Sequence, residues 1–500
     1  MTVAPTKAVL VMILSFLSVI IITSFYFNNY IPIWVSSTSI LLSLFSTHYL
    51  YKKKYINVLC YIVFVVFALP FIHIPSYMFF DFGTKPKWLW GIYVNPYMID
   101  ENIIKLTAML GALGCAGIVL SYFYRSNKII AQEKNILYTQ NPKFKTLPMA
   151  SFFIFLFLGL FFAEISSTTQ SVFDAAYAFG MTNSLSGISF DSAWMFGFII
   201  ILFTFCDAWL DRSPTKGKIK RFLAIILIFY LVIFLQLLKG DREALALVAA
   251  ILVTPLFCSR IFNDINNYKV SPLVILIGVL FILLINLTIG IMRMSMIGLD
   301  TISEGIDVLL YFFTEDDCPH RSCYGFNDLF SGTWSAVLLT PISIAGDYIY
   351  NTYIYEYKGL KWGEDYWNIF LSIPPGFLAN WLDYVRPISS MSGPAWEMRY
   401  GGGGYHAIVL PFRNFSIIGV FLIPFFYGLI VRKVEYWTIK KISVTRLSLI
   451  LTLIMCSPIW LWYGEKALIN AIIIWFVMSC IFKFFCSINF IFRDYKWKSY

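Results

Sequence analysis

The chain has 500 residues, of which 59% are hydrophobic and only 13% are charged. Soluble domains are nearer to half apolar and a quarter charged, so a water-soluble fold is excluded and lipid must surround much of this chain. The net charge of +10 would suit a nucleic-acid-binding protein, but the placement of the basic residues indicates membrane topology instead. The sequence also lacks the motifs of nucleotide-binding proteins, serine hydrolases and zinc proteases, which excludes those classes.

Apolar runs long enough to cross a bilayer, about 17–25 residues each, recur along the chain. We count twelve, which predicts an all-α polytopic membrane protein with about 12 transmembrane helices. The first run has no small-residue cleavage site after it and is expected to remain as an anchor. The runs lie at 8–27, 31–50, 56–75, 103–123, 147–166, 191–209, 222–238, 244–261, 271–291, 407–430, 446–463 and 467–487.

The basic residues predict which side of the membrane each segment faces. If the N-terminus is cytoplasmic and the spans alternate, the cytoplasmic segments hold more than twice as many Lys and Arg residues as the opposite side. Such an excess is the usual orientation signal of polytopic proteins. Both termini are therefore predicted to be cytoplasmic, and the basic charge is mainly a topological signal. No nucleic acid partner is expected.

The spans divide the chain into three parts. Residues 1–291 hold nine spans, 292–406 form one large outer loop, and 407–500 hold three spans and a cytoplasmic tail. Within the loop, the apolar stretches 331–345 and 366–378 are too short to cross a bilayer. They are expected to form helices that lie at the membrane surface or pack on the bundle.

A charged turn separates two apolar spans at Lys239, Gly240, Asp241, Arg242 and Glu243. One interpretation is a solvated turn with Arg242 reaching lipid phosphates. The other is an anion site at the membrane surface, because the planar guanidinium of Arg binds phosphate through two parallel hydrogen bonds and keeps its charge.

Further basic residues lie in or beside the large loop. Arg293 follows the ninth span, Arg386 precedes a proline, and Arg399 lies shortly before the glycines 401–404. Glycine allows a backbone to approach a ligand closely, although a flexible linker has the same composition. His406 follows at the start of the next span. Each of these residues is either an interfacial or solvated group or part of an outer-face site.

Two cysteines, Cys318 and Cys323, lie in the polar part of the large loop, whereas the other seven lie in or beside apolar runs. Outside the cytoplasm thiols tend to pair, so a Cys318–Cys323 disulfide that pins a local turn is expected. The acidic residues Glu315, Asp316 and Asp317 suit a solvated run better than a cation site. No metal site and no cofactor are predicted.

Two stretches resemble the O-antigen polymerase family of oligosaccharide repeat-unit polymerases and, more distantly, the O-antigen ligases. Residues 240–245, Gly-Asp-Arg-Glu-Ala-Leu, look like the short outer turn of that family, in which Gly-x-Arg precedes small and aliphatic residues. Residues 406–410 and 414–419 look like the segment after its large outer loop. This chain departs from the pattern at Asp241 and Glu243, where small residues are common, so Asp241 could pair with Arg242 locally.

The resemblance implies a fold similar to the GT-C class of membrane glycosyltransferases, in a bacterial inner membrane with a periplasmic active site. The implied reaction moves a growing glycan from undecaprenyl diphosphate to a new lipid-linked repeat unit, with lipid-linked oligosaccharides and membrane lipid as partners. A chain-length regulator protein is a candidate partner. The expected catalytic residues are Arg242, Arg293, Arg386 and His406, and the expected substrate-binding residues are Lys239, Asp383, Tyr384, Trp396, Glu397, Arg399 and Tyr405.

Three alternatives stay open on the sequence alone. A ligase that moves glycan to lipid A core would use the same reaction class. A flippase or transporter should instead carry ionisable groups at mid-span, whereas most charges here lie at span ends. A non-catalytic assembly protein would have no need for the outer-face arginines.

Overall fold

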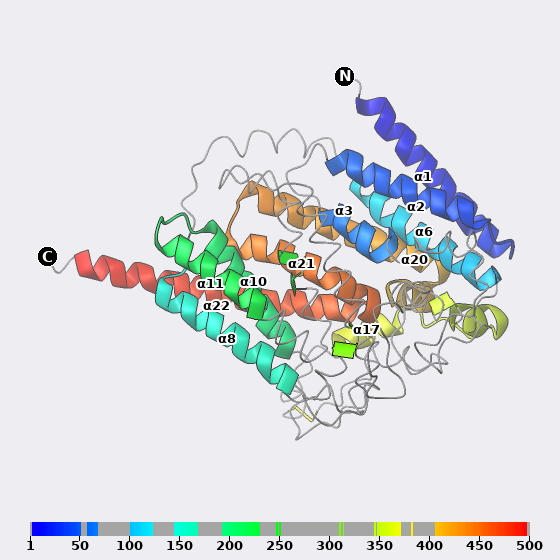
Figure 1. Cartoon of the computed structure of the whole chain (residues 1–500). Helices are drawn as coiled ribbons and strands as arrows, with labels where there is room; N and C mark the ends of the chain where they lie inside the picture. The colour runs from blue at the N-terminus through cyan, green and yellow to red at the C-terminus, as the bar shows by residue number, and fades with distance from the viewer. Residues whose placement is uncertain are drawn as a thin grey trace. The chain divides into compact units, whose positions relative to one another are not determined.

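The computed structural model contains helices in every part of the chain that it describes (Figure 1). The chain forms two compact units. Unit 1 comprises Met1–Lys134, Asn327–Tyr436 and Ser457–Leu468, and unit 2 comprises Asn135–Phe326, Trp437–Cys456 and Ile469–Tyr500. The described residues are 3–51, 58–68, 101–123, 145–168, 193–230, 247, 248, 250, 251, 310, 311, 314, 345, 346, 348–371, 382, 383 and 406–497.

Four of the described helices are long and apolar enough to cross a membrane: Lys7–Tyr26, Asn102–Phe123, Ala407–Lys440 and Ala467–Ser487. Shorter apolar helices cover Val58–Phe67, Met149–Phe162, Met195–Leu210 and Val444–Trp460. All eight coincide with predicted spans, so the chain is a helical membrane protein. The count of twelve spans and the GT-C-like fold stay predictions.

Unit 1 is organised around helix α6, which contacts α1, α2 and η1. Small residues let other helices approach it closely, as is usual between membrane helices. A Cβ on Gly117 of α6 would meet the carbonyl oxygen of Phe421 in α20, and one on Gly428 would meet the side chain of Ser121. The helices of unit 1 are α1 (Val3–Tyr26), α2 (Ile33–Tyr51), α3 (Val58–Ile62), the π-helix η1 (Val63–Ala68), α6 (Glu101–Phe123), the π-helix η5 (Tyr350–Tyr355), α17 (Glu364–Leu371) and most of α20 (His406–Lys440).

Aromatic contacts at the two ends of unit 1 show the directions of its long helices. Phe25, near the end of α1, packs edge-on against Phe412, near the start of α20, with ring centroids 5.8 Å apart. At the other ends, Lys7 of α1 lies over Phe123 of α6, and Arg432 of α20 lies over Tyr122. α1 therefore runs opposite to α6 and α20, as the predicted alternation requires. The side of the membrane that each end faces stays a prediction.

Unit 2 packs its helices mainly through aromatic side chains. Phe155 of α8 and Phe203 of α10 both pack on Phe482 of α22, with centroids 6.0 Å and 5.5 Å away. The indole N–H of Trp475 in α22 donates to the carbonyl oxygen of Thr445 in α21 at 3.0 Å. The helices of unit 2 are α8 (Met149–Thr168), α10 (Ala193–Leu210), α11 (Lys216–Tyr230) and parts of α21 (Val444–Tyr463) and α22 (Glu465–Trp497).

A buried lysine joins α11 to α10 in unit 2. Lys220 Nζ lies 2.7 Å from Asp207 Oδ2 and 2.8 Å from Asp211 Oδ2, and it donates to the carbonyl oxygen of Leu147 at 2.6 Å. Burial alone would raise the pKa of Asp211, but hydrogen bonds from Lys220 and Ser213 outweigh it and hold this pKa below its usual value. Lys220 is among the residues from which the topology is predicted, yet it is fully buried. Helix α11 begins at Lys216, earlier than the predicted span at 222, so Lys220 pairs from within its first turns.

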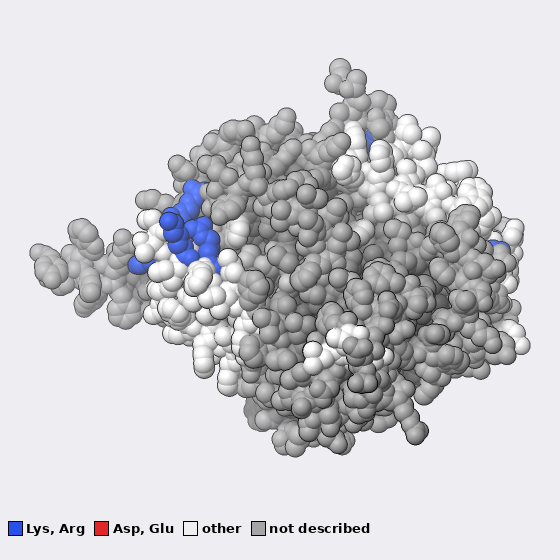
Figure 2. Space-filling model, in the orientation of Figure 1, with Lys and Arg blue, Asp and Glu red and all other residues white. Residues whose placement is uncertain are grey.

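The other basic residues of this segment are at the surface. Figure 2 shows Lys and Arg side chains gathered around the start of α11, where Arg212, Lys216 and Lys218 are exposed. Exposed charges at a helix end suit the headgroup or water layer beside a membrane. The segment therefore separates into one buried lysine that pairs with two carboxylates and several basic residues at the surface.

Replacing Lys220 by Met should destabilise the protein strongly. The change leaves Asp207 and Asp211 close together without a counter-charge, and removal of one partner from a buried ion pair typically costs about 3–5 kcal/mol. The measurement is the free energy of unfolding by SDS in mixed micelles. Lys218→Met, which removes an exposed charge two residues away, is the matched control and should stay within about 0.5 kcal/mol of the parent.

Candidate functional site

Helix α20 is interrupted near its start. Phe415 has φ −135° and ψ 18°, and Ser416 has φ 57° and ψ −154°, so the helix breaks between its first turns and its long remainder. A non-glycine residue with positive φ costs of order 1–3 kcal/mol and persists only where surrounding contacts hold it. The break also leaves the last carbonyl groups of the first helical segment without their usual partners.

The polar groups at this break are satisfied by the segment that leads into α17. The backbone N–H groups of Lys361 and Trp362 donate to the carbonyl oxygens of Arg413 and Asn414 at 3.0 Å and 3.2 Å. In return, Asn414 Oδ1 accepts from the N–H groups of Gly363 and Asp365 at 3.0 Å and 3.3 Å. An amide oxygen that accepts from the first N–H groups of a helix acts as a cap. The two helices therefore complete each other's ends.

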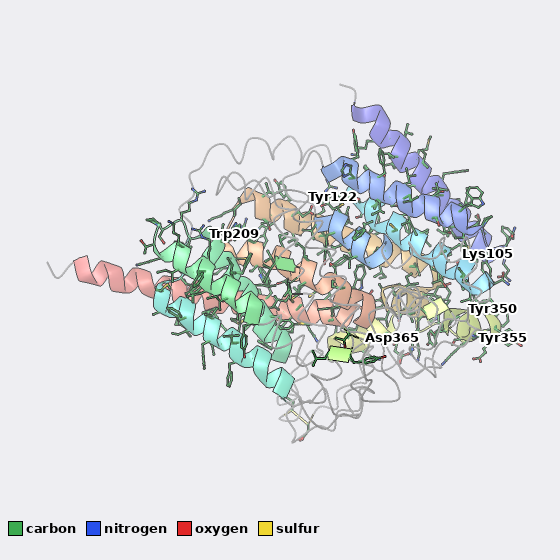
Figure 3. All side chains as sticks on the ribbon, viewed as in Figure 1. Lys105, Tyr122, Trp209, Tyr350, Tyr355 and Asp365 are labelled. Carbon is green, nitrogen blue, oxygen red and sulfur yellow. The ribbon has the colours of Figure 1, made fainter. Side chains whose placement is uncertain are left out.

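A buried ion pair lies at the same place. Arg413 Nε is 3.0 Å from Asp365 Oδ2, with the two side chains 4% and 9% exposed. Arg413 Nη1 donates to the hydroxyl of Tyr348 at 3.2 Å, and Asn414 Nδ2 donates to Asp365 Oδ2 at 2.9 Å. Asp365 lies on the short helix α17 (Figure 3). We call Tyr348, Asp365, Tyr366, Arg413, Asn414 and Glu465 the junction cluster.

Glu465 brings a second carboxyl to the junction cluster. The hydroxyl of Tyr366 donates to Glu465 Oε1 at 3.4 Å, and the ring of Tyr366 stacks on Phe415 with centroids 5.9 Å apart. Burial raises the pKa of Glu465 to about 7, although the nearby side chains of Trp460 and Tyr366 oppose the shift. Burial, followed by the charge of Glu465, raises the pKa of Tyr366 well above its usual value.

The junction cluster is buried and combines a fixed charge with a carboxyl that can exchange protons. A carboxyl whose pKa is near 7 can take up or release a proton at neutral pH, as general acid–base groups do. Arg413 supplies a permanent positive charge at the same junction. Among the residues that the structure describes, no group of three or more His, Cys, Asp or Glu side chains is placed to hold a metal ion.

Most of the site residues predicted from the sequence lie outside the described part of the chain. His406 is the first residue of α20, about two helical turns before Arg413, but its side chain is not among those described. Asp383 is exposed, with φ 49°. Helix α17 (Glu364–Leu371) covers the first part of the apolar stretch 366–378, whose position at the membrane surface stays a prediction. The candidates outside the described residues are Lys239, Arg242, Arg293, Tyr384, Arg386, Trp396, Glu397, Arg399 and Tyr405, together with Cys318 and Cys323.

The junction cluster was not predicted from the sequence, although the sequence contains one residue that points to it. Arg413 is a charged residue inside an apolar run, and such residues are functional candidates by default. Arg413 lies near the start of the run 407–430, where a charge is also common at the membrane interface. Asp365 and Glu465 carry no comparable signal, because each lies outside the apolar runs, where charged residues are ordinary.

Comparison with known proteins assigns no family to this chain. No model of a known protein family matches the chain, and neither a curated protein nor a solved structure matches it. The site is therefore interpreted from its own residues and from the motifs described above.

Breaking the Arg413–Asp365 ion pair from one side should destabilise unit 1. Asp365→Leu leaves Arg413 buried without its carboxylate, for which a loss of about 3–5 kcal/mol is expected. The double variant Asp365→Leu with Arg413→Met removes both charges and should be less destabilised than Asp365→Leu alone. SDS-driven unfolding measures all three proteins. The control is Glu364→Gln, because Glu364 pairs with Lys361 at 3.2 Å on the surface, where such pairs contribute about 1 kcal/mol or less. Equal stabilities for the single and double variants would contradict a buried ion pair.

Glu465 should make stability fall as the pH rises from about 4.5 to about 7. Its pKa is about 7 in the folded protein, against a usual 4.5, so within this window the folded state holds more protons than the unfolded chain and raising the pH favours unfolding. In Glu465→Gln this contribution is absent. The difference in unfolding free energy between variant and parent should therefore change by roughly 3 kcal/mol across the window, in favour of the variant at high pH. Parallel pH profiles for the two proteins would show that Glu465 titrates normally.

Proposed function

We propose that this protein is a metal-independent membrane glycosyltransferase that polymerises lipid-linked oligosaccharide repeat units. In this proposal it lies in a bacterial inner membrane with both termini cytoplasmic and its active site on the periplasmic face. The growing glycan moves from undecaprenyl diphosphate to the non-reducing end of a new lipid-linked repeat unit. The fold is proposed to be GT-C-like, with twelve spans and the large loop 292–406.

The observation that carries this proposal is the junction cluster. The buried Arg413–Asp365 pair and the capping amide of Asn414 fix α17, which belongs to the proposed outer loop, to the first turns of α20. A site that must hold two large substrates needs a rigid support for its loop residues. His406 begins the same helix, so this support lies next to one of the proposed catalytic residues.

The reaction needs positive charge more than it needs a strong base. The bond between the anomeric carbon and the diphosphate oxygen breaks, and a bond from that carbon to an acceptor hydroxyl oxygen forms. The acceptor proton passes to a protein base, while the bonding electrons leave with the diphosphate. We propose that Arg242, Arg293 and Arg386 stabilise this leaving group, and that His406 orients or deprotonates the acceptor. The remaining substrate-binding candidates would contact the sugars.

A transporter is less well supported by the described residues. A transport path should be lined by ionisable groups near mid-span. In unit 2 the charged groups Asp207 and Lys220 neutralise each other at the ends of their helices. In unit 1 the ion pair of Arg413 and Asp365 joins a loop helix to the start of a span. Both arrangements hold helices together instead of lining a path.

Alanine at Arg242, Arg293 or Arg386 should abolish polymer formation. The loss of one charged donor to the leaving group should cost on the order of 3 kcal/mol, or about a hundredfold in rate. Arg→Lys should restore little, because an ammonium group lacks the planar fork. The assay is the ladder of polymer lengths on gels, from cells that lack the native gene and express each variant at equal protein level.

Arg221→Ala is the matched control, because this residue lies in the basic first turns of α11, on the predicted cytoplasmic side, and should be catalytically silent. A normal ladder from Arg242→Ala would rule out the diphosphate clamp, and a normal ladder from His406→Ala would remove the base but leave the clamp. If single repeat units still reach the cell surface in the Arg variants, the ligase alternative is also excluded, because transfer to lipid A core would then not depend on this protein.

A further inference from the structure

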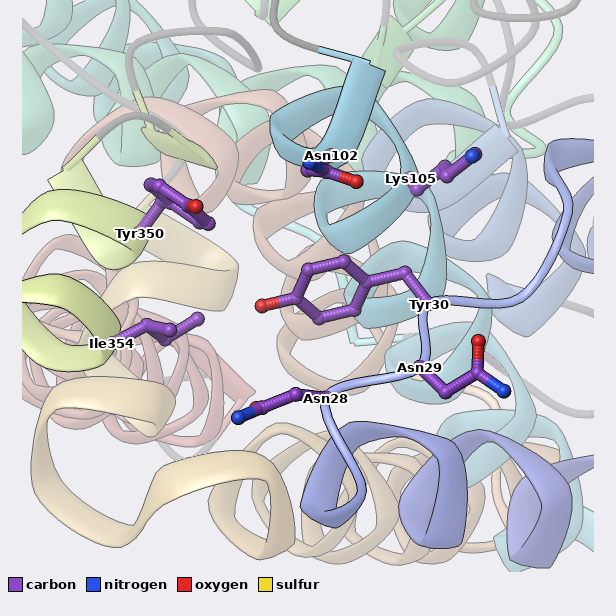
Figure 4. A pocket seen from close by; sticks show the side chains of 7 residues that line it. All are labelled: Asn28, Asn29, Tyr30, Asn102, Lys105, Tyr350 and Ile354. Atoms are coloured by element: carbon purple, nitrogen blue, oxygen red, sulfur yellow. The ribbon is translucent and has the colours of Figure 1, made fainter.

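A polar hollow lies at one end of unit 1, apart from the junction cluster. It has a volume of about 340 Å³ and is lined by Asn28, Asn29, Tyr30, Asn102, Lys105, Tyr350 and Ile354 (Figure 4). Small-molecule sites begin at about 300 Å³, so the hollow is large enough for a ligand. Six of the seven lining residues are polar, in a chain that is 59% hydrophobic. Lipid tails therefore do not explain its composition.

Three separate segments build the hollow, and packing holds each in place. The turn between α1 and α2 supplies residues 28–30, the first turn of α6 supplies Asn102 and Lys105, and η5 supplies Tyr350 and Ile354. A Cβ on Gly346, just before η5, would meet Thr107 and Ile103 of α6. Because only glycine allows this approach, η5 is fixed against the helix that carries Asn102.

Aromatic contacts tie the same segments to the junction cluster. Tyr353 of η5 packs on Phe412 with centroids 5.9 Å apart, and Phe25, just before the α1–α2 turn, packs on the same ring at 5.8 Å. Phe412 precedes Arg413 directly. Tyr348, which accepts a hydrogen bond from Arg413, lies two residues before Tyr350. Side-chain contacts therefore connect the hollow to the junction cluster within unit 1.

The lining matches the chemistry of a sugar. Each Asn side chain carries both a donor and an acceptor, as each sugar hydroxyl does, and Tyr30 and Tyr350 add phenols that can donate or accept. The ring of Tyr30 projects between the neighbouring segments (Figure 4) and offers an apolar face to the C–H groups of a pyranose. Among the described residues that line the hollow there is no carboxylate, and Lys105 contributes a positive charge.

We infer that this hollow is a binding subsite for one or two sugar rings of a saccharide. The inference rests on the proposed function in one respect, because that function identifies the saccharide as part of the lipid-linked repeat unit. The ends of α1 and α6 that form the hollow are the predicted outer ends, where such a repeat unit is exposed. Asn28, with φ 51°, keeps the α1–α2 turn in a conformation that favours Asn or Gly.

The test uses the full-length protein in detergent. The ligand is the oligosaccharide that mild acid releases from the lipid-linked repeat units of cells that lack this gene. Calorimetric titration should detect binding to the parent. Asn28→Gly removes an amide but keeps the turn, and Tyr350→Phe removes one hydroxyl. Each should weaken binding about fivefold to tenfold, the usual effect of one lost hydrogen bond. Tyr355→Phe is the matched control, because Tyr355 lies on the same helix, 75% exposed and outside the lining (Figure 3).

A second measurement does not depend on the stability of these variants. With Asn29→Cys, the oligosaccharide should slow maleimide modification at least fivefold, while Tyr355→Cys should react at an unchanged rate. Equal binding by the parent, Asn28→Gly and Tyr350→Phe would overturn the subsite. Tighter binding of glycerol 3-phosphate, lost in Lys105→Gln, would also overturn it in favour of a lipid headgroup. Saccharide binding together with a normal ladder from Arg242→Ala would keep the subsite and reject only the proposed clamp.

Discussion

A charged side chain that leaves water must find its counter-charge nearby, and the Arg413–Asp365 ion pair shows how this requirement organises unit 1. Arg413 lies in the first turns of a long apolar helix and is almost fully buried. Its carboxylate comes from α17, a helix of only eight residues that would be marginal alone. The pair therefore determines where α17 lies, and the segment before α17 then supplies the hydrogen bonds that the break in α20 requires.

The same constraint appears in unit 2 with a different outcome. Lys220 satisfies two carboxylates and a backbone carbonyl at once, which leaves the lysine no capacity for a ligand. At the junction cluster the balance is looser, because Glu465 is buried and the hydrogen bond that its Oε1 accepts from Tyr366 is long, at 3.4 Å. Its pKa of about 7 is the consequence. A fully paired network stabilises the fold, whereas a carboxyl that titrates near neutral pH can also serve chemistry.

The junction cluster, the polar hollow and the start of α20 form a continuous set of contacts. Phe412 packs against α1 and η5, Arg413 pairs with α17, and Asn414 caps that helix. Three successive residues therefore fix three different segments. A loop that has to present arginines and a histidine to a lipid-linked glycan would need such an anchor, because small displacements of catalytic groups lower rates strongly.

The amino-acid sequence by itself determined the helical membrane class and the positions of the apolar helices, because a bilayer demands long uninterrupted apolar runs that can be read directly. It did not reveal the break at Ser416, the partner of Arg413, the burial of Lys220 or the hollow beside Tyr30. Each of these depends on residues far apart in the chain, such as Asp365 with Arg413 and Asn102 with Tyr350. Only tertiary packing brings such residues together, since local periodicity carries no information about which distant charge or amide will lie opposite.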